Sequence, residues 1–388
     1  MATAVLDLDL ERLHEGLEQL EAYDSALVLL RMRGRPVGQA VLSLGGTRLD
    51  AAELRTQILE GADSAFWEAW LRTRLELPEP AEATKGPSAT VAICTRNRTD
   101  DLSRCLVSLL AMPDDAQDVL VVDNAPSNDD TRVLVQRHPR VRYVREDRPG
   151  LDVARNRALR EARGEIVAFT DDDASVDPLW LRMLLRNFRD PLVMAATGLT
   201  MALELETSAQ VMFERSGGFA RGFRRKVFDA AAHDPLYAWH AGAGVSMALR
   251  RSATDHVGFF DEALDAGTPT HAGGDTDMFR RLLKAGYRIA YDPEALNWHR
   301  HRRSEAELAR QLVGYQIAAF AIYCRALLFE GDLGAASHVV WFLRRELRNL
   351  AKSILRRPQA PALSSVLPRL RAALLGPGLY IYSRKRLG

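Results

Sequence analysis

Residues 165–178 read EIVAFTDDDASVDP, an apolar run that ends abruptly in three consecutive aspartates. The run at 166–169 is typical of a buried strand, which would deliver Asp171, Asp172 and Asp173 at its carboxyl end. Three adjacent like charges repel one another, and the pKa of each rises unless a cation neutralises it. Alternate residues of an extended segment point the same way, so Asp171 and Asp173 would share one side. Two such oxygen ligands, with water and a phosphate completing the shell, suit Mg²⁺ or Mn²⁺. The alternative is a solvated acidic turn, and the position at a strand end in an α/β pattern favours the metal site.

Strand-like and helix-like segments alternate around this stretch. Strands are predicted at 90–95, 119–123, 141–145 and 166–170, and helices between them at 102–110, 130–136 and 153–163. This alternation predicts an α/β fold with a doubly wound, mostly parallel sheet. Ligands of such sheets bind at the carboxyl ends of the strands. Each of the four predicted strands is followed by polar residues that would meet at this edge: 95–98, 123–124, 148–150 and 171–173.

Each of these polar residues has a possible chemical use and a simpler alternative. Asp123 could accept hydrogen bonds from a ribose hydroxyl or a pyrimidine N–H, but it also begins a turn-forming sequence. Arg96, Arg98 and Arg148 could pair with phosphate, although single arginines in loops are usually solvated. Asn156 lies inside a predicted helix, where Asn is a poor choice, so we expect it to bond a neighbouring loop. No glycine-rich phosphate loop follows the first strand, which argues against dinucleotide binding and P-loop chemistry.

A second acidic stretch, GGDTD at 273–277, precedes a predicted helix. Asp275 lies where an N-cap is expected, and capping alone would explain it. A carboxylate on a glycine-rich turn that faces a metal site could instead act as a general base. His299 follows a predicted strand at 287–291. Beside an acidic metal site it could be a further ligand or bind diphosphate, and alone it would indicate a basic surface turn.

The chain divides into three predicted regions. Residues 1–85 are predicted to form a small α+β accessory module, with a hairpin at 26–44 followed by two helices. A plausible linker at 81–87 leads into the strand–helix alternation of the domain at 86–303. Residues 304–388 are predicted to be a helical extension.

The charge of the whole chain is nearly balanced, with 52 basic and 51 acidic residues, which removes any whole-chain argument for nucleic acid as a partner. The balance hides a basic carboxyl-terminal segment, 341–388, whose one acidic residue is Glu346. There an apolar helical stripe between Val339 and Leu355 lies opposite a basic face. Packing on the central domain with a solvated basic face and contact with an anionic membrane surface both remain open.

Cysteine usage and the amino terminus point to one compartment. None of the three cysteines forms a C-x-x-C pair, which fits a reducing environment. The first residues lack the basic start and apolar core of a signal peptide. The longest nearly uncharged run, 312–324, is too short to span a bilayer. We therefore expect a cytoplasmic location, with peripheral contact at the inner face of the membrane as an open alternative.

Taken together, these motifs resemble those of a family 2 glycosyltransferase with the GT-A fold. The resemblance covers about residues 88–303, in the order and at the spacing typical of the family. It rests on six segments: VAICTRNR (91–98), VLVVDN (119–124), RPGLDVARNRAL (148–159), VAFTDDDASVDP (167–178), GAGVSMALRR (242–251) and GGDTDMFRRLLKAGYRIAYDPEALNWH (273–299).

This resemblance implies a nucleotide-diphosphate-sugar donor and an acceptor hydroxyl on a glycan, a lipid-linked molecule or a small molecule. It also implies Mn²⁺ or Mg²⁺ on Asp171 and Asp173, where we add His299 as a candidate ligand, and a base at Asp275. Asp275 would take the proton of the acceptor hydroxyl as it attacks the anomeric carbon from the face opposite the leaving group. This attack would invert the anomeric carbon without a covalent enzyme intermediate. The donor-binding candidates are Thr95, Arg96, Arg98, Asp123, Arg148, Asn156, Asp171 and Asp172.

Two departures from the family pattern matter. The family usually has Glu before the base, where this chain has Gly274. The Gln-x-x-Arg-Trp motif and membrane spans of processive members are missing from the sequence, which favours transfer of single sugars. Two alternatives remain: a nucleotidyltransferase, which would be expected to carry a glycine-rich basic loop near the first strand, and a non-catalytic nucleotide-sugar-binding protein, suggested by Gly274.

Overall fold

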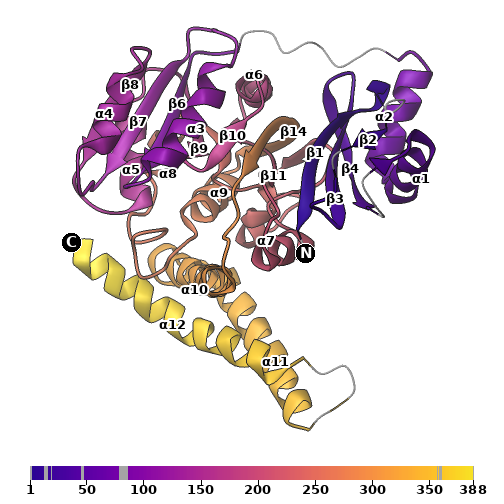
Figure 1. The fold of residues 1–388 in the computed structure, drawn as a ribbon. Coiled ribbons are helices and arrows are strands. Elements are labelled where there is room, and N and C mark those ends of the chain that lie inside the picture. The colour runs from indigo at the N-terminus through magenta and orange to yellow at the C-terminus, as the bar shows by residue number, and fades with distance from the viewer. Residues whose placement is uncertain are drawn as a thin grey trace.

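A computed structural model describes residues 2–12, 16–18, 20–44, 48–77, 86–355, 357 and 361–387. Most of the predicted linker at 81–87 lies outside these residues. Figure 1 shows a large central sheet with helices, a smaller amino-terminal sheet with helices on one side, and long carboxyl-terminal helices below. The predicted α/β class and helical extension are confirmed. The exact boundaries at 85 and 303 stay a prediction.

The amino-terminal region is a small sheet covered by two helices. Its central strand β3 pairs in parallel with β1 and in antiparallel with β4, so the predicted hairpin is confirmed. Aspartates cap both helices, because the side chains of Asp50 and Asp63 each accept two backbone N–H groups. The elements are β1 (Thr3–Asp9), η1 (Leu10–Arg12), β2 (Leu17–Glu18), β3 (Ser25–Met32), β4 (Arg35–Ser43), β5 (Arg48–Leu49), α1 (Ala51–Gly61) and α2 (Ser64–Arg74).

Nine strands of the described chain form the central sheet, in the order β10-β14-β11-β13-β9-β6-β7-β8, with β12 also paired to β14. The half from β9 to β8 is parallel, as predicted, whereas β13 joins β9 and β11 in antiparallel. The strands are β6 (Ala89–Thr95), β7 (Asp118–Asn124), β8 (Val141–Glu146), β9 (Ile166–Asp171), β10 (Ala174–Val176), β11 (Val193–Ala202), β12 (Lys226–Phe228), β13 (Ser246–Arg250) and β14 (Arg288–His299).

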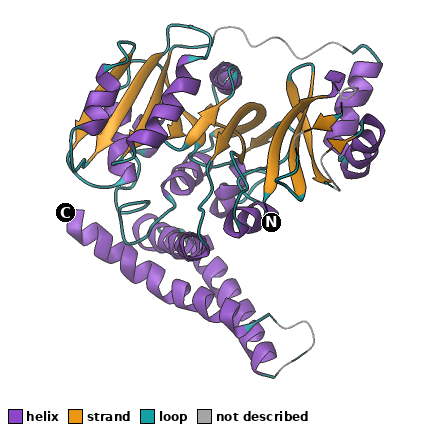
Figure 2. Cartoon of the chain, viewed as in Figure 1, coloured by secondary structure: helices purple, strands orange, loops and turns teal. Residues whose placement is uncertain are grey.

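Helices cover both faces of this sheet (Figure 2). Successive residues of β6 point to opposite faces, so Val91 and Ile93 pack with one set of helices and Ala92 with the other. The first core contains residues of α3 and α6, and the second contains residues of α5 and α9. The helices of this domain are α3 (Thr99–Leu110), α4 (Asp130–Gln136), α5 (Leu151–Glu161), α6 (Trp180–Leu185), η2 (Arg186–Arg189), α7 (Ser208–Arg215), η3 (Pro235–Ala241), α8 (Ala253–Val257) and α9 (Gly274–Lys284).

Two local predictions need correction. β14 does not end near Tyr291 but continues to His299, which is buried, so His299 does not lie on a basic surface turn. The N-cap of α9 is Gly273 rather than Asp275, which lies in the first helical turn. The left-handed backbone of Gly273, with φ of 104°, explains the difference, because glycine adopts this conformation without strain.

The carboxyl-terminal region consists of α10 (Glu305–Glu330), α11 (Leu333–Ile354) and α12 (Leu363–Leu387). α11 projects away from the sheet and α12 runs back along α10 (Figure 1). α10 is longer than the apolar run seen in the sequence, and its length and composition alone would allow it to cross a membrane. However, 44% of its most apolar window is buried, and core helices of soluble proteins meet the same criterion.

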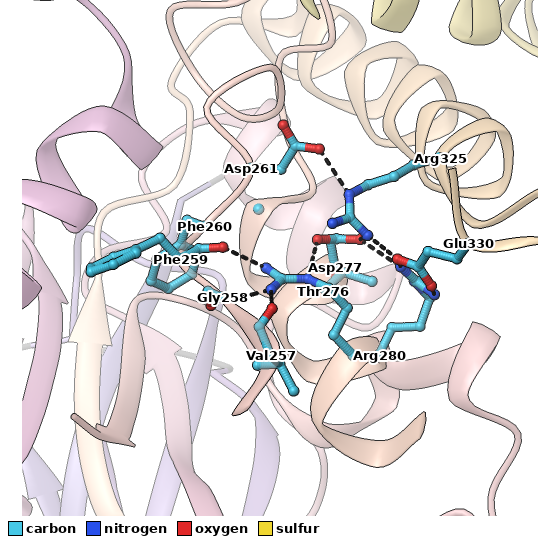
Figure 3. Close-up of polar contacts among 12 residues, drawn as sticks. Val257, Gly258, Phe259, Phe260, Asp261, Thr276, Asp277, Arg280, Arg325 and Glu330 are labelled. Carbon is cyan, nitrogen blue, oxygen red and sulfur yellow. Dashed lines mark hydrogen bonds and ion pairs between the residues drawn. The ribbon is translucent and has the colours of Figure 1, made fainter. Parts of the chain in front are cut away.

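A buried ion network ties α9 to this helical region (Figure 3). The Asp277 carboxylate, which is fully buried, accepts hydrogen bonds from Arg280 at 3.0 Å and Arg281 at 2.8 Å. From α10, Arg325 Nη1 lies 3.3 Å from Asp277, and Glu330 pairs with Arg280. Burial alone would raise the pKa of Asp277, but the surrounding arginines lower it to about 2.

We expect Asp277→Asn to destabilise the protein by about 3 kcal/mol at pH 7, because three arginines lose a buried partner. The folded-state pKa of Asp277 is depressed, so its contribution is present above about pH 4 and is lost as pH falls toward 2. Denaturant unfolding should therefore show a smaller difference between parent and variant at pH 3 than at pH 7. The control is Asp255→Asn, at an exposed position on α8, and an equal penalty at both pH values would contradict the assignment.

Candidate functional site

The sheet register brings together the three predicted metal ligands. Asp171 ends β9 and Asp173 follows it, while the pairing of Ala174 with His299 places the end of β14 alongside. His299 Nε2 lies 3.1 Å from a carboxylate oxygen of Asp173 and 3.9 Å from one of Asp171. One donor atom from each residue can be chosen so that all three lie within 4.8 Å of one another. This is a set of two oxygen donors and one nitrogen donor that could hold a single divalent ion.

The last residue of β6 and the loop that follows it also contact the aspartates. Thr95 Oγ1 donates a hydrogen bond of 2.7 Å to Asp172. The Arg98 guanidinium contacts both Asp172 and Asp173, each at 2.7 Å. Thr95 and Arg98 therefore contact the acidic cluster. Their predicted contact with the donor stays a prediction.

Burial and these cations determine the charges of the cluster. Burial raises the pKa of Asp172 to about 7, in spite of Arg98, and burial together with Asp173 raises the pKa of Asp171. Asp173 is the exception, because His299 and Arg98 outweigh burial and lower its pKa. Burial disfavours the His299 cation, but Asp173 and Asp171 raise its pKa overall. Asp173 and His299, which lie 3.1 Å apart, therefore each shift the pKa of the other toward the charged form, whereas a bound cation would take the neutral imidazole.

Asp275 lies on the first turn of α9, where two backbone groups fix its carboxylate. Gly244 N–H donates to Oδ2 at 2.7 Å, and Thr276 N–H donates to Oδ1 at 2.6 Å. A Cβ added to Gly244 would lie 2.6 Å from Arg155 Nη2 and 3.3 Å from Asp275 Oδ2, so a larger residue here would displace the Arg155 guanidinium. Burial disfavours the Arg155 charge, but nearby carboxylates, including those of Asp275 and Asp171, raise its pKa. Arg155 is therefore the buried cation that the two acidic stations share.

Asp123, at the end of β7, has an available acceptor in a buried position. One oxygen accepts a hydrogen bond from the Tyr143 hydroxyl at 2.9 Å, whereas Oδ1 has no partner within the described residues. Burial raises the pKa of this carboxyl in spite of the Tyr143 hydrogen bond. Asp123 is the register partner of Thr95, so this unpartnered oxygen lies one strand away from the acidic cluster.

The remaining donor candidates have different surroundings. Arg96 is exposed. Arg148 is also exposed and forms two hydrogen bonds with Glu262, at 2.8 and 3.2 Å. Asn156 donates to Phe260 O and Glu262 and accepts from Phe260 N–H, so it holds a neighbouring loop, as its place in a helix predicts. Contact of these three residues with a donor stays a prediction.

Sequence reasoning missed four residues of the site, of which the first is Arg155 itself. Asp152 and Asp265 are buried beside Arg155, at 2.9 and 2.7 Å from its Nη1. Arg302 follows β14 and lies 4.0 Å from Asp173. A charged residue on the buried face of the helix predicted at 153–163 was the available signal for Arg155, whereas Asp152 lay just outside that predicted helix. Asp265 comes from a loop without regular periodicity and gave none.

Comparison with known proteins agrees with this geometry. Residues 90–258 match the model described as glycosyl transferase family 2. A pre-mycofactocin glycosyltransferase of Mycobacterium tuberculosis is 29% identical over 300 residues, which cover 72% of this chain and 59% of that protein. Succinoglycan biosynthesis protein ExoM of Rhizobium meliloti is 30% identical over 217 residues, or 53% of this chain and 64% of that protein. The matches thus span about three fifths of the length of these relatives.

A similar fold occurs in the mannosyltransferase PcManGT from Pyrobaculum calidifontis, whose structure was solved in complex with GDP-Man and Mn²⁺. The TM-score is 0.50 with 18% sequence identity, over 82% of this chain and 92% of the other. This likeness confirms the predicted GT-A fold. Together, the family match over residues 90–258 and the named relatives support a family 2 glycosyltransferase.

Proposed function

We propose that the chain transfers a single sugar from a nucleotide-diphosphate sugar to an acceptor hydroxyl, with inversion at the anomeric carbon. The observation that carries this proposal is the cluster of Asp171, Asp173 and His299, together with a fixed carboxylate at Asp275, since Asp171 and Asp275 both raise the pKa of buried Arg155. Such a site can hold a diphosphate leaving group at the strand ends and deprotonate an acceptor at the start of α9.

The donor set fits a divalent cation. Asp171, Asp173 and His299 would hold Mn²⁺ or Mg²⁺, and the imidazole nitrogen favours Mn²⁺, because Mg²⁺ prefers oxygen ligands. When bound, the ion would act as a Lewis acid that stabilises the departing diphosphate.

The chain's own residues supply the other functions. The unpartnered oxygen of Asp123 is placed to accept a hydrogen bond from the nucleoside. Asp275 accepts the proton of the attacking hydroxyl, and the N–H groups of Gly244 and Thr276 hold the carboxylate while it does so. The leaving group and the base lie at different stations, which supports attack from the face opposite the diphosphate and hence inversion.

The family match favours glycosyl transfer over the nucleotidyltransferase alternative. The non-catalytic alternative rested on Gly274 alone, and Asp275 remains half-buried with its carboxylate fixed by two N–H groups. The acceptor stays open among a glycan, a lipid-linked molecule and a small molecule.

We also propose that α11 makes peripheral contact with an anionic membrane surface, at the inner face of the membrane of a cytoplasmic protein. Leu347 and Ile354 are 57% and 63% exposed, so part of the predicted apolar stripe is not packed against the domain, and Trp341 of the same helix is 55% exposed. Trp341 borders a hollow of about 510 Å³ that three arginines also line: Arg344, Arg345 and Arg348. Apolar side chains among basic ones suit the interface of anionic lipids.

The first prediction from this proposal concerns the base. Asp275→Asn keeps the shape of the side chain but removes the proton acceptor, so turnover should fall by roughly 10²–10⁴-fold. Donor affinity should change little, because the predicted nucleoside and metal contacts lie on other elements. Steady-state turnover and donor titration on this variant, with Asp255→Asn as the control, test the assignment. Near-normal turnover would exclude Asp275 as the base.

The second prediction concerns metal-dependent donor binding. Asp173→Ala should abolish the Mn²⁺-dependent part of nucleotide-sugar affinity measured by calorimetry, since it removes one of three candidate ligands. Circular dichroism checks that the fold survives the loss of the contacts with Arg98 and His299. The matched control is Asp129→Ala, which removes an exposed carboxylate of the same domain. Unchanged metal-dependent affinity in the Asp173 variant would refute the site.

The third prediction concerns the membrane surface. The double variant Arg344→Glu/Arg348→Glu should lose sedimentation with anionic liposomes, because each basic residue near such a surface contributes about 1 kcal/mol. Reversing two exposed arginines of the central domain, Arg132→Glu and Arg140→Glu, should leave sedimentation intact. If the parent protein fails to sediment with either anionic or neutral vesicles, surface contact through α11 is excluded.

A further inference from the structure

Gly274, the departure from the family pattern, has the carboxylate of Asp152 in the space where a side chain would begin. A Cβ added to Gly274 would lie 2.0 and 2.3 Å from the two oxygens of Asp152 and 2.4 Å from its Cγ. Gly274 is not among the glycines with positive φ, so its backbone would accept any residue. Glycine is therefore required here by the position of Asp152 and not by the chain conformation.

Asp152 itself is an expensive residue to bury. It lies in the first turn of α5 with no exposed surface, and burial and nearby Asp265 raise the pKa of its carboxyl well above the usual range. Its Oδ1 accepts a hydrogen bond from Arg155 Nη1 at 2.9 Å. Its Oδ2 is buried and has no hydrogen-bond partner within the described residues. A buried carboxyl group with one unsatisfied oxygen lowers the stability of the fold, so we expect Asp152 to have another role.

Contacts lead from Asp152 to the candidate base through one arginine. Arg155 Nη1 also contacts Asp265 Oδ2 at 2.7 Å, and the same oxygen of Asp265 accepts the N–H of Gly274 at 3.1 Å. The other end of the guanidinium, Nη2, lies against Gly244. The N–H of Gly244 in turn holds Asp275.

We infer that Asp152 is a positioning residue for Asp275, supplying from α5 the carboxylate that the family resemblance places at position 274. It holds the Arg155 guanidinium between Asp265 and the turn of Gly244, so that the candidate base keeps its orientation. The inference rests on the proposed function for the role of Asp275 and on the resemblance for the Glu at position 274, whereas the competition of the two side chains for one space stands on geometry.

The start of α9 gives a physical reason for a carboxyl group at this place. Gly273, the N-cap of α9, has no side chain to satisfy the free N–H groups of the first turn. Asp265 accepts one of them, and the carboxyl group of Asp152 lies beside Gly274 at the positive end of the helix. A Glu at position 274 would begin where the Asp152 carboxylate now lies, so its own carboxylate could reach Arg155. The pocket has room for one of these two groups.

A reciprocal exchange tests the inference. The set is the parent chain, D152N, D152A, G274E, D152A/G274E and D152A/G274A. Thermal unfolding gives the apparent Tm of each variant. Release of nucleoside diphosphate from UDP-, GDP- and dTDP-sugars with Mn²⁺ gives turnover, and calorimetry gives donor affinity. D152N keeps the shape of the side chain without the charge, and D152A/G274A fills the space without a carboxylate.

We expect G274E alone to lower Tm markedly, because two carboxylates cannot share the space. D152N should fold and bind donor within about threefold of the parent, but turn over at least about tenfold more slowly, since misorientation affects the reacting group more than binding. D152A/G274E should recover at least about tenfold in turnover, and also recover Tm, relative to D152A/G274A. This non-additivity is the signature of two residues that share one contact.

Two results would overturn the inference: D152N with the turnover of the parent, or D152A/G274E no better than D152A/G274A in both Tm and turnover. Failure of the proposed function is a separate outcome. If the parent releases no nucleoside diphosphate from any of the donors, glycosyl transfer is in doubt. The comparison of Tm between the two double variants still decides whether the carboxylate can be exchanged.

Discussion

Buried carboxylates held in place by buried cations are the constraint on which this structure depends. Asp171 ends β9, and Asp172 and Asp173 follow it. The mutual repulsion of these carboxylates is offset by Arg98, which contacts Asp172 and Asp173, and by His299, which contacts Asp173. The second acidic station depends in the same way on Arg155. Each cation comes from a different element: the loop after β6, the end of β14 and the helix α5. The site therefore exists only when the sheet and its helices are assembled.

The pairing register of the strands determines which side chains meet at the site. Cys94 pairs with Asp171 across β6 and β9, and Ala174 pairs with His299 across β10 and β14. A shift of one residue in either pairing would turn the polar side chains to the opposite face of the sheet. α9, which carries Asp275, is anchored from behind by the network around Asp277. The carboxyl-terminal helices thus contribute to the rigidity of the site, although they lie outside the family resemblance.

Periodicity and motifs made part of the fold and of the site predictable from the sequence. Strands β6 to β9 and the cluster of Asp171 and Asp173 at their ends were found because apolar runs stop at charged residues. The predicted end of β14 and the predicted cap of α9 were wrong. β14 continues past an irregularity in its pairing between Asp292 and Leu296, and a left-handed glycine stands where an aspartate cap was expected. The role of Asp152 could not be predicted, because it depends on the space beside Gly274, which is formed by a residue 122 positions away along the chain.

The central claim is that this chain binds a nucleotide-diphosphate sugar through a divalent cation at the end of β9. The most direct measurement is a thermal-shift panel of UDP-, GDP- and dTDP-sugars, recorded with Mn²⁺ and again after chelation. A ligand that binds the native state raises the apparent melting temperature. The account predicts that at least one donor raises it with Mn²⁺ and that chelation removes most of this rise. No shift with any donor, or an equal shift after chelation, would contradict it.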